Sequence, residues 1–224
     1  MKILSLGKAI KHDLLEIDYI DDIDEIDSLK KYDYLIVKGG DGAIRRSVAK
    51  AYAKDMPSLI VDASGSFNVI AKYYKLPKVE TILDDIAQKK TKTQKHRLKK
   101  LNDEIFLFSA GNMGDVQHIA VSENLRSGYL KDGVGKYLIA FIFLLPLHIF
   151  TTPWMLFVKD RFFIFDLLPF LKRVGNFYGE LEKPIKRELS SEYNFVELDG
   201  DIVVIKTKDI HIEVIDYINI VSYR

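Results

Sequence analysis

The strongest constraint on the fold is an alternation of apolar runs and helix-like segments between residues 30 and 90. The runs YLIV at 34–37 and SLIV at 58–61 have the length and composition of buried strands. Three segments with helical spacing follow them, at 43–53, 67–74 and 79–88. This order is typical of parallel βαβ units, in which ligands bind at the carboxyl ends of the strands.

The remaining chain divides into a short opening and a strand-rich second half. The opening predicts strands at Lys2–Leu6 and Leu14–Ile20 and a short helix at Ile23–Lys31. After residue 92 come extended runs broken by Gly or Asp, beginning with a hairpin turned at Asn102-Asp103. We therefore expect an α/β domain over 1–91 and a mostly antiparallel β domain over 92–224, whose last strand is free to return to the first domain.

Composition limits the function classes. The 224 residues include no cysteine, which excludes a disulfide framework and thiolate metal sites and suits a reducing cytoplasm. The N-terminal apolar core is too short for a signal peptide, so we expect a cytoplasmic protein. The acidic run Asp13–Asp27 is expected to be a solvated face. The basic run Lys89–Lys100 is either a solvated face or a contact for anionic phosphates on a lipid surface. It has no accompanying nucleic-acid signature, so we expect no nucleic acid.

A long apolar stretch, Tyr137–Val158, carries no formal charge. It is long enough to span a bilayer, but Pro146 and Pro153 interrupt it. We expect a buried helix near Gly135–Leu145 followed by a core strand that includes Trp154. A transmembrane helix and a membrane-docking surface are the alternatives.

The chemistry is concentrated where the first two buried strands end. The first strand runs into Gly39, Gly40, Asp41 and Gly42, and a helix follows directly. Glycines at such a turn allow phosphate to approach backbone N–H groups and the helix N-terminus. The second strand ends in another small-residue turn, residues 63–66, so the two turns are expected to lie side by side at one edge of the sheet. A tight turn at GGDG and helix capping by Ser66 and Asn68 are the simpler alternatives.

These motifs resemble those of the diacylglycerol kinase catalytic-domain family, which includes bacterial lipid kinases and sphingosine kinases. GGDGAI and GSFNVIAKYYKLP resemble the family's GGDGT and GTGNDFAR motifs. IFLFSAGNMGDV, GVGKYLIAFIFLL and FVELDGDIVVIKTKDIHIEVID resemble later segments in the same order. NAD kinases share GGDG but have a different second motif, so NAD kinase activity is the weaker alternative.

The resemblance implies a nucleotide-binding α/β domain followed by a β-sandwich, and an ATP-dependent lipid kinase with Mg²⁺ as a cofactor. It implies Asp41, Asp199 and Asp201 as catalytic carboxylates. The implied nucleotide-binding residues are Gly39, Gly40, Asp41, Gly42, Ala43, Arg45, Gly65, Ser66 and Asn68. The implied partners are a lipid substrate and, by peripheral contact, the inner face of a membrane; a homodimer is left open. Without the resemblance, LDGD reads as a hairpin turn.

The chain departs from the family pattern at several of these positions. Ala43 replaces a threonine whose hydroxyl points at phosphate, and Arg45 and Arg46 replace Asn-Glu. Asn68 is followed by Val69 instead of an acid, and the family's N-terminal phosphate turn has no match in KILSLGKAIK. Three interpretations follow: a minimal kinase in which an arginine contacts phosphate, a binding protein without transfer activity, and a structural domain in which the arginines solvate a helix face.

Overall fold

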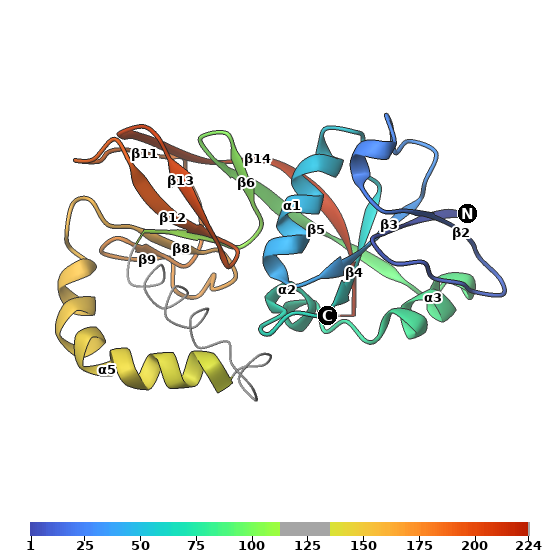
Figure 1. Ribbon diagram of the computed structural model, residues 1–224, viewed down its shortest axis with the longest axis horizontal. Helices are drawn as coiled ribbons and strands as arrows, with labels where there is room; N and C mark the ends of the chain where they lie inside the picture. Colours follow the sequence, from blue (N-terminus) through green and yellow to red (C-terminus); the bar gives the residue numbers. More distant parts are fainter. Residues whose placement is uncertain (113–134, 224) are drawn as a thin grey trace. The chain divides into compact units, whose positions relative to one another are not determined.

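The computed structural model describes residues 1–112 and 135–223, which divide into two compact units (Figure 1). The first unit consists of Met1–Leu98 and Asp216–Arg224, and the second of Lys99–Ile215. Strands β5 (Lys92–Leu101) and β14 (Asp209–Ser222) belong to both units. The division between the two units falls inside β5 and inside β14.

The first unit is built on a parallel sheet. Its strands follow the order β2 (Glu16–Ile20), β1 (Lys2–Leu6), β3 (Tyr34–Gly39), β4 (Ser58–Ala63), β14. The pairs from β2 to β4 are all parallel, and β14 joins them through the parallel pair Ile220↔Leu59. The expected α/β domain with a parallel sheet is therefore confirmed, and β2 lies at the edge of the sheet.

Three helices connect the strands of this sheet. They are α1 (Asp41–Tyr52), α2 (Val69–Tyr73) and α3 (Val79–Ala87). The apolar positions of α3 pack against one sheet face, where Ile3, Ile36 and Ile60 form a row. Helix α1 lies against β3 and buries Ile44 and Val48. Successive strand residues point to opposite faces, so a buried strand needs apolar residues throughout, as YLIV has.

The expected helix at 23–31 is wrong beyond its first turn. Only η1 (Ile23–Glu25) forms, and Asp22 and Glu25 close it as a capping box. Ile26 is extended, and the chain after it does not return to a helix: Leu29 is buried and its N–H donates to the Lys54 carbonyl oxygen at 2.8 Å.

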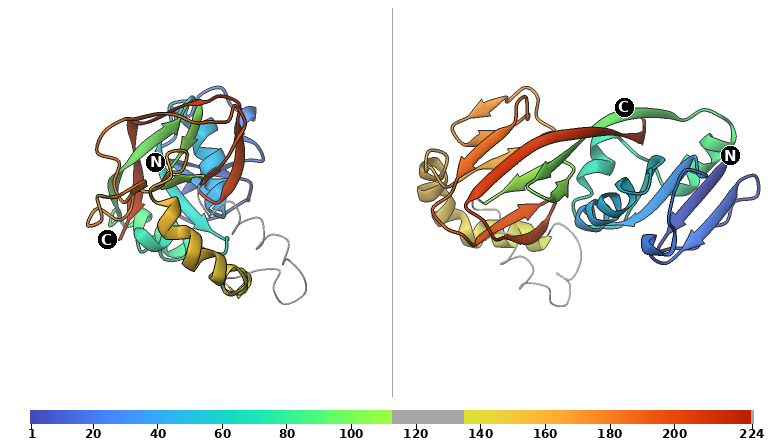
Figure 2. Two further views of the ribbon diagram at one scale, coloured as in Figure 1. Left: turned by 90° about the vertical axis from the view of Figure 1, so that its left-hand side faces the viewer. Right: turned by 90° about the horizontal axis from the view of Figure 1, so that it is seen from above.

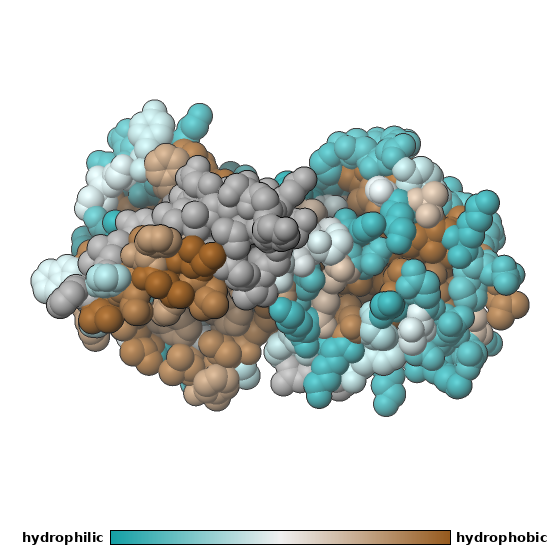
Figure 3. Space-filling view, turned by 60° about the horizontal axis from the view of Figure 1, so that its bottom comes forward, coloured by the Kyte–Doolittle hydropathy of each residue, from teal (hydrophilic) through white to brown (hydrophobic). Residues whose placement is uncertain are grey.

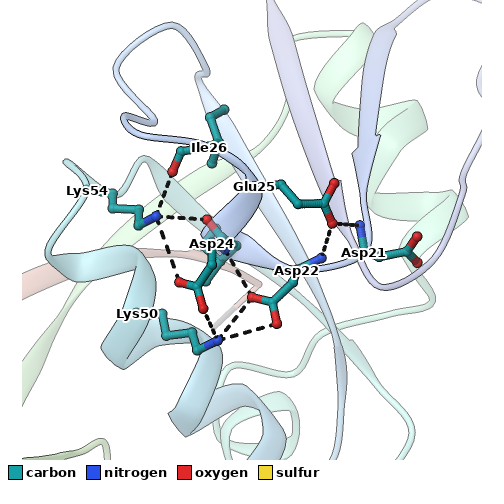
Figure 4. A network of polar contacts seen from close by, with 8 residues as sticks. Asp21, Asp22, Asp24, Glu25, Ile26, Lys50 and Lys54 are labelled. Atoms are coloured by element: carbon teal, nitrogen blue, oxygen red, sulfur yellow. Dashed lines mark hydrogen bonds and ion pairs between the residues drawn. The ribbon is translucent and has the colours of Figure 1, made fainter.

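The acidic run around η1 forms ion pairs with the end of α1 (Figure 4). Lys50 Nζ lies 3.0 Å from Asp22 Oδ1 and 2.6 Å from Asp24 Oδ2. The Lys54 ammonium donates to the carbonyl oxygens of Ile23 and Ile26. Such exposed pairs are screened by water and stabilise a fold only weakly, so the run remains largely a solvated face.

The second unit contains two sheets with a shared core. One sheet has the order β13 (Asp201–Ile205), β12 (Asn194–Leu198), β7 (Ser109–Gly111), β8 (Phe163–Phe165), β10 (Phe177–Tyr178), β9 (Arg173–Val174). The other contains β6 (Glu104–Phe106), the end of β5, β14 and β11 (Ile185–Glu188). Figure 2, right, shows the long red ribbon of β14 beside the green β5. Among the strand pairs described in the second unit, β8–β10 is parallel and the others are antiparallel. This confirms the expected strand-rich second domain and the hairpin turned at 102–103.

The core between these sheets is mostly apolar, and it also contains a buried ion pair. Phe106, Phe162 and Ile164 are among its fully buried residues. Lys99 is 0% exposed, and its Nζ lies 2.9 Å from Asp166 Oδ2. Asp166 also accepts from the Leu181 N–H at 2.7 Å, so the carboxylate holds two segments of the unit together.

Helix α5 (Gly135–Met155) corrects the expectation for the apolar stretch. The helix continues through both prolines to Met155, so no strand forms at Trp154. It is not buried either: Ile142 is 59% exposed, Phe143 74% and Trp154 75%. Within the described part of the chain, no helix has both the length and the apolar character needed to span a membrane.

The buried ion pair predicts a large effect of removing one partner. Asp166→Asn leaves the Lys99 ammonium uncompensated in the core and is expected to lower the free energy of unfolding by about 3–5 kcal/mol. The double variant Lys99→Met/Asp166→Leu removes both charges and should recover most of this loss. Urea unfolding measures both values, and equal losses in the two variants would contradict the assignment.

Candidate functional site

The two glycine turns meet at the carboxyl ends of β3 and β4. The register pairs Gly39 with Ala63, and the Ser64 N–H donates to the Gly39 carbonyl oxygen at 2.9 Å. Beyond that pair, the backbones of Gly40 and Gly65 touch. The predicted juxtaposition of GGDG and GSFN is therefore what the structure contains, as parallel strands require.

The glycines are needed because the turns approach each other closely. A Cβ built on Gly65 would lie 2.5 Å from Gly40 Cα, and one on Gly39 would lie 2.7 Å from Ala43 Cβ. None of these three glycines has a positive φ. At Gly39, Gly40 and Gly65, the space that a side chain would fill is thus occupied by the neighbouring backbone or by Ala43.

The first turn of α1 offers backbone donors. Gly40 is the N-cap of this 12-residue helix and supplies no side-chain cap, and the first intrahelical bond runs from the Ile44 N–H to the Gly40 carbonyl oxygen at 3.0 Å. The preceding N–H groups of a helix have no acceptor within it, and the helix dipole makes this end favourable for an anion. This is the arrangement that binds phosphate in many proteins.

Asp41 connects the two turns. Its Oδ2 accepts from the Val69 N–H at 3.1 Å, at the start of α2. Its Oδ1 is buried and accepts no hydrogen bond from the described residues. Burial raises the pKa of Asp41, while N–H groups at the start of α2 and the charge of Lys72 oppose this rise. An acceptor oxygen that is buried without a donor fits a ligand hydroxyl or a cation.

Asn68 shapes the second turn. It adopts a left-handed conformation with φ of 50°, and its Oδ1 accepts from the Gly65 N–H at 2.8 Å. Its side chain does not cap α2, although Asn68 is the N-cap residue of that helix. The half-buried Ser66 lies in the same turn. Their contact with a nucleotide stays a prediction.

The structure adds Lys8 to the residues at this edge. Gly7 follows β1 with φ of +73°, and Lys8 Nζ lies 3.5 Å from Asp62 Oδ2 near the end of β4. Lys8 was not recognised in the sequence because KILSLGKAIK lacks the family's phosphate turn. The signal available was its position directly after the first strand, since the carboxyl ends of parallel strands share one edge.

The two arginines of α1 differ in environment. Arg45 is buried, with 5% of its surface exposed, on the same side of the helix as Val48, whereas Arg46 is exposed. The interpretation that both arginines solvate a helix face is therefore wrong for Arg45. The expectation that Arg45 contacts phosphate stays a prediction.

The Asp199-Gly200 pair forms the turn between β12 and β13. Both residues have positive φ, 49° and 90°, as a tight hairpin turn requires. Asp199 is 0% exposed, and its carboxylate accepts from the N–H groups of Leu107, Phe108 and Ser109. Asp199 thus anchors the chain between β6 and β7.

The environment of Asp199 changes its acidity. Burial raises its pKa to about 6, and the three N–H donors and the charge of Lys99 limit the rise. Asp201, two residues later in β13, is half-buried and not enclosed in this way. The two carboxylates implied by the resemblance therefore have different surroundings, and Asp201 is the more accessible one.

A protein-bound metal has no ready set of ligands among these residues. In residues 1–112 and 135–223, no group of three or more His, Asp or Glu side chains is placed to hold a metal ion.

The Met113–Val116 part of the IFLFSAGNMGDV segment and Gly133-Val134 of the GVGKYLIAFIFLL segment lie outside the described residues.

Comparison with known proteins identifies the fold. No family model and no curated protein matches the sequence. Among solved structures, a proposed diacylglycerol kinase from Bacillus anthracis str. Sterne gives a TM-score of 0.58 at 15% identity, covering 99% of this chain and 94% of that one. A second diacylglycerol kinase structure from that organism gives 0.57 at 14% identity, covering 99% and 96%. An NAD kinase from Archaeoglobus fulgidus in complex with ATP gives 0.47 at 13% identity, covering 100% and 93%.

This likeness confirms the fold expected from the resemblance to diacylglycerol kinases. The match extends over nearly the whole chain, so it includes both the parallel α/β unit and the antiparallel unit. At 15% identity it establishes the fold alone, and the reaction has to be argued from this chain's own residues.

The contact between the turns predicts that Gly65 tolerates no side chain. Gly65→Ala places a Cβ against the Gly40 backbone, and we expect it to lower the free energy of unfolding by about 1–3 kcal/mol. Ser64→Ala is the matched control: Ser64 is exposed in the same turn, so its loss should stay within about 0.5 kcal/mol. Chemical denaturation distinguishes the two, and a neutral Gly65→Ala would contradict the packing described.

Asp199 predicts a pH-dependent stability. Because its pKa is higher in the folded protein than its ordinary value, its contribution is present at low pH and is lost as the pH rises from about 4 to about 6. The stability of the wild type relative to Asp199→Asn should therefore fall over this range, by up to about 3 kcal/mol for a shift of about two pKa units. A flat curve for Asp199→Asn would contradict the assignment.

Proposed function

We propose that this protein is an ATP-dependent lipid kinase that transfers the γ-phosphoryl group of ATP to the hydroxyl of diacylglycerol or a related lipid. The observation that carries the proposal is the meeting of the Gly40 and Gly65 turns beside the uncapped N-terminus of α1. This is the position at which open α/β sheets bind ligands, and it offers the backbone donors that phosphate requires.

The residues present fit a nucleotide. Gly39–Ala43 and Gly65–Asn68 would hold the phosphates and sugar of ATP, and Lys8 and Lys72 supply positive charge in the same unit. Asp41 Oδ1 would accept from a sugar hydroxyl or from water on a nucleotide-bound Mg²⁺. The cation would neutralise charge on the phosphates, which is its general role in phosphoryl transfer.

The transfer also requires a group that accepts the proton of the lipid hydroxyl. As the lipid oxygen forms a bond to the γ-phosphorus, the bond to the ADP oxygen breaks and the hydroxyl proton passes to a base. Asp199 is committed to three backbone N–H groups, so we assign the base to Asp201, the more accessible carboxylate of the DGD turn.

A nucleotide-binding protein without transfer activity is the second candidate. The observation that favours it is the enclosure of Asp199, because the carboxylate implied as catalytic by the resemblance has no exposed surface. The family's threonine hydroxyl is also absent at Ala43. Both candidates require nucleotide binding at the glycine turns, and only the first requires Asp201.

A lipid kinase assay tests the proposal. With labelled ATP, Mg²⁺ and mixed vesicles, we expect label in diacylglycerol or in a sphingosine-like lipid, and a loss of at least about 100-fold in Asp41→Asn and in Asp201→Asn. Asp33→Asn is the matched control for Asp41, because Asp33 directly precedes β3, at the other end of that strand, and its carboxylate accepts from the Lys2 N–H.

The outcomes separate the candidates. Label in lipid that depends on Asp41 and Asp201 supports the kinase. Thermal stabilisation by ATP that Asp41→Asn abolishes, without transfer to any lipid or to NAD, supports the binding protein and overturns the kinase. Label in NAD and not in lipid would instead assign NAD kinase activity.

A further inference from the structure

The second unit carries an apolar surface that the proposed transfer chemistry does not use. Along α5, Leu138, Ile142, Leu145 and Ile149 recur at helical spacing, and their exposed fractions range from 38% to 60%. Exposed aromatic side chains, Phe141, Phe143 and Trp154, extend this surface around the helix. Figure 3 shows it as a broad brown area over the unit that contains α5.

The apolar surface continues from α5 onto a neighbouring hairpin. The Asn176 N–H donates to the Leu156 carbonyl oxygen, and its side-chain amide donates to that of Val158, both at 2.7 Å. A Cβ on Gly175 would lie 2.6 Å from the Leu156 oxygen, so the β9–β10 hairpin lies directly against the end of α5. Phe157, 74% exposed, and Phe170, 82% exposed, flank this junction.

Cationic side chains border the apolar surface on the hairpin side. A shallow groove of about 510 Å³ begins at the hairpin, and five cationic and two acidic side chains line it. The cationic ones are Lys172, Arg173, Lys183, Lys186 and Arg187. Lys172 pairs with Glu182 at 2.6 Å, and Arg173 lies over the Tyr178 ring, so an excess of positive charge remains next to Phe170 and Val174.

We propose that α5 and the β9–β10 hairpin form a docking surface for a bilayer that contains anionic phospholipids. A bilayer fits better than a second copy of the chain because the exposed apolar residues are not confined to one stripe of the helix and pass onto another segment. Tyr137–Val158 also has no charged residue to form the polar rim of a protein interface. Apolar and aromatic side chains enter the headgroup boundary, while nearby Lys and Arg are attracted to anionic lipids.

Trp154 allows a direct test, because it is the single tryptophan of the chain and is 75% exposed on α5. With vesicles of phosphatidylcholine and phosphatidylglycerol, and without nucleotide, we expect a blue shift of its emission and co-flotation of the protein. Binding should weaken at least tenfold with phosphatidylcholine alone, and should also weaken at high salt, which screens the attraction to the lipid surface.

Matched variants distinguish binding through the apolar surface from nonspecific adsorption to vesicles. Phe157→Ser/Phe170→Ser should weaken flotation at least tenfold. Phe195→Ser/Val204→Ser is the control: these residues face each other across β12 and β13 of the same unit with exposed fractions of 61% and 46%, and their loss should leave flotation unchanged. Lys183→Gln/Lys186→Gln should reduce the preference for anionic vesicles and spare the residual binding to neutral ones.

Each other outcome overturns the proposal. No flotation and no spectral shift with any vesicle would exclude docking. A blue shift without lipid that grows with protein concentration, together with a dimer in sedimentation, would assign the surface to a second copy. Flotation that Phe157→Ser/Phe170→Ser leaves intact would assign binding to another surface. Because no nucleotide is used, these results are independent of whether the protein transfers phosphate.

Discussion

The contact between the backbones of Gly40 and Gly65 is the constraint on which the candidate site depends. It brings together two turns that are 25 residues apart in the chain, and it leaves no room for a Cβ on Gly65 and little room for one on Gly40. With the turns so close, Asp41 on the first reaches the start of α2 beyond the second, and one of its oxygens stays buried without a donor. A single steric condition thus fixes the position of the α1 N-terminus, the acidic side chain and the second turn together.

In the second unit, buried charged side chains hold the strands together. Lys99, Asp166 and Asp199 are buried in or beside an otherwise apolar core, and their bonds fix the ends of several strands. Such groups stabilise one arrangement of the chain more than they stabilise folding, because removing a charge from water costs much of what its partners return. The same enclosure distinguishes the two carboxylates of the DGD turn, since Asp199 is fully buried and Asp201 is half-buried.

Local pattern was enough to predict the parallel sheet and the meeting of its two turns. Strands such as YLIV are buried on both faces, and parallel strands place their carboxyl ends at one edge, so the positions of GGDG and GSFN follow from chain order. Contacts made at long sequence separation could not be predicted. Asp199 accepts from N–H groups about 90 residues away in the sequence. Leu29 is not helical, and its side chain is buried. The exposure of α5 could not be predicted either, because an apolar helix has the same sequence pattern whether it lies in a core or on a surface.

Strand β14 has a consequence for how the protein is made. It pairs with β4 in the first unit and with β11 in the second, and it follows every other strand in sequence. These partners lie in one eight-stranded sheet, which a ribosome completes only after β14 emerges, so the N-terminal unit cannot finish folding while the second is still being synthesised. Until then the edge of β4 is unpaired, and such an edge is prone to aggregation. The two units thus share one late folding step. The glycine turn that follows β4 is held by a completed sheet only after that step.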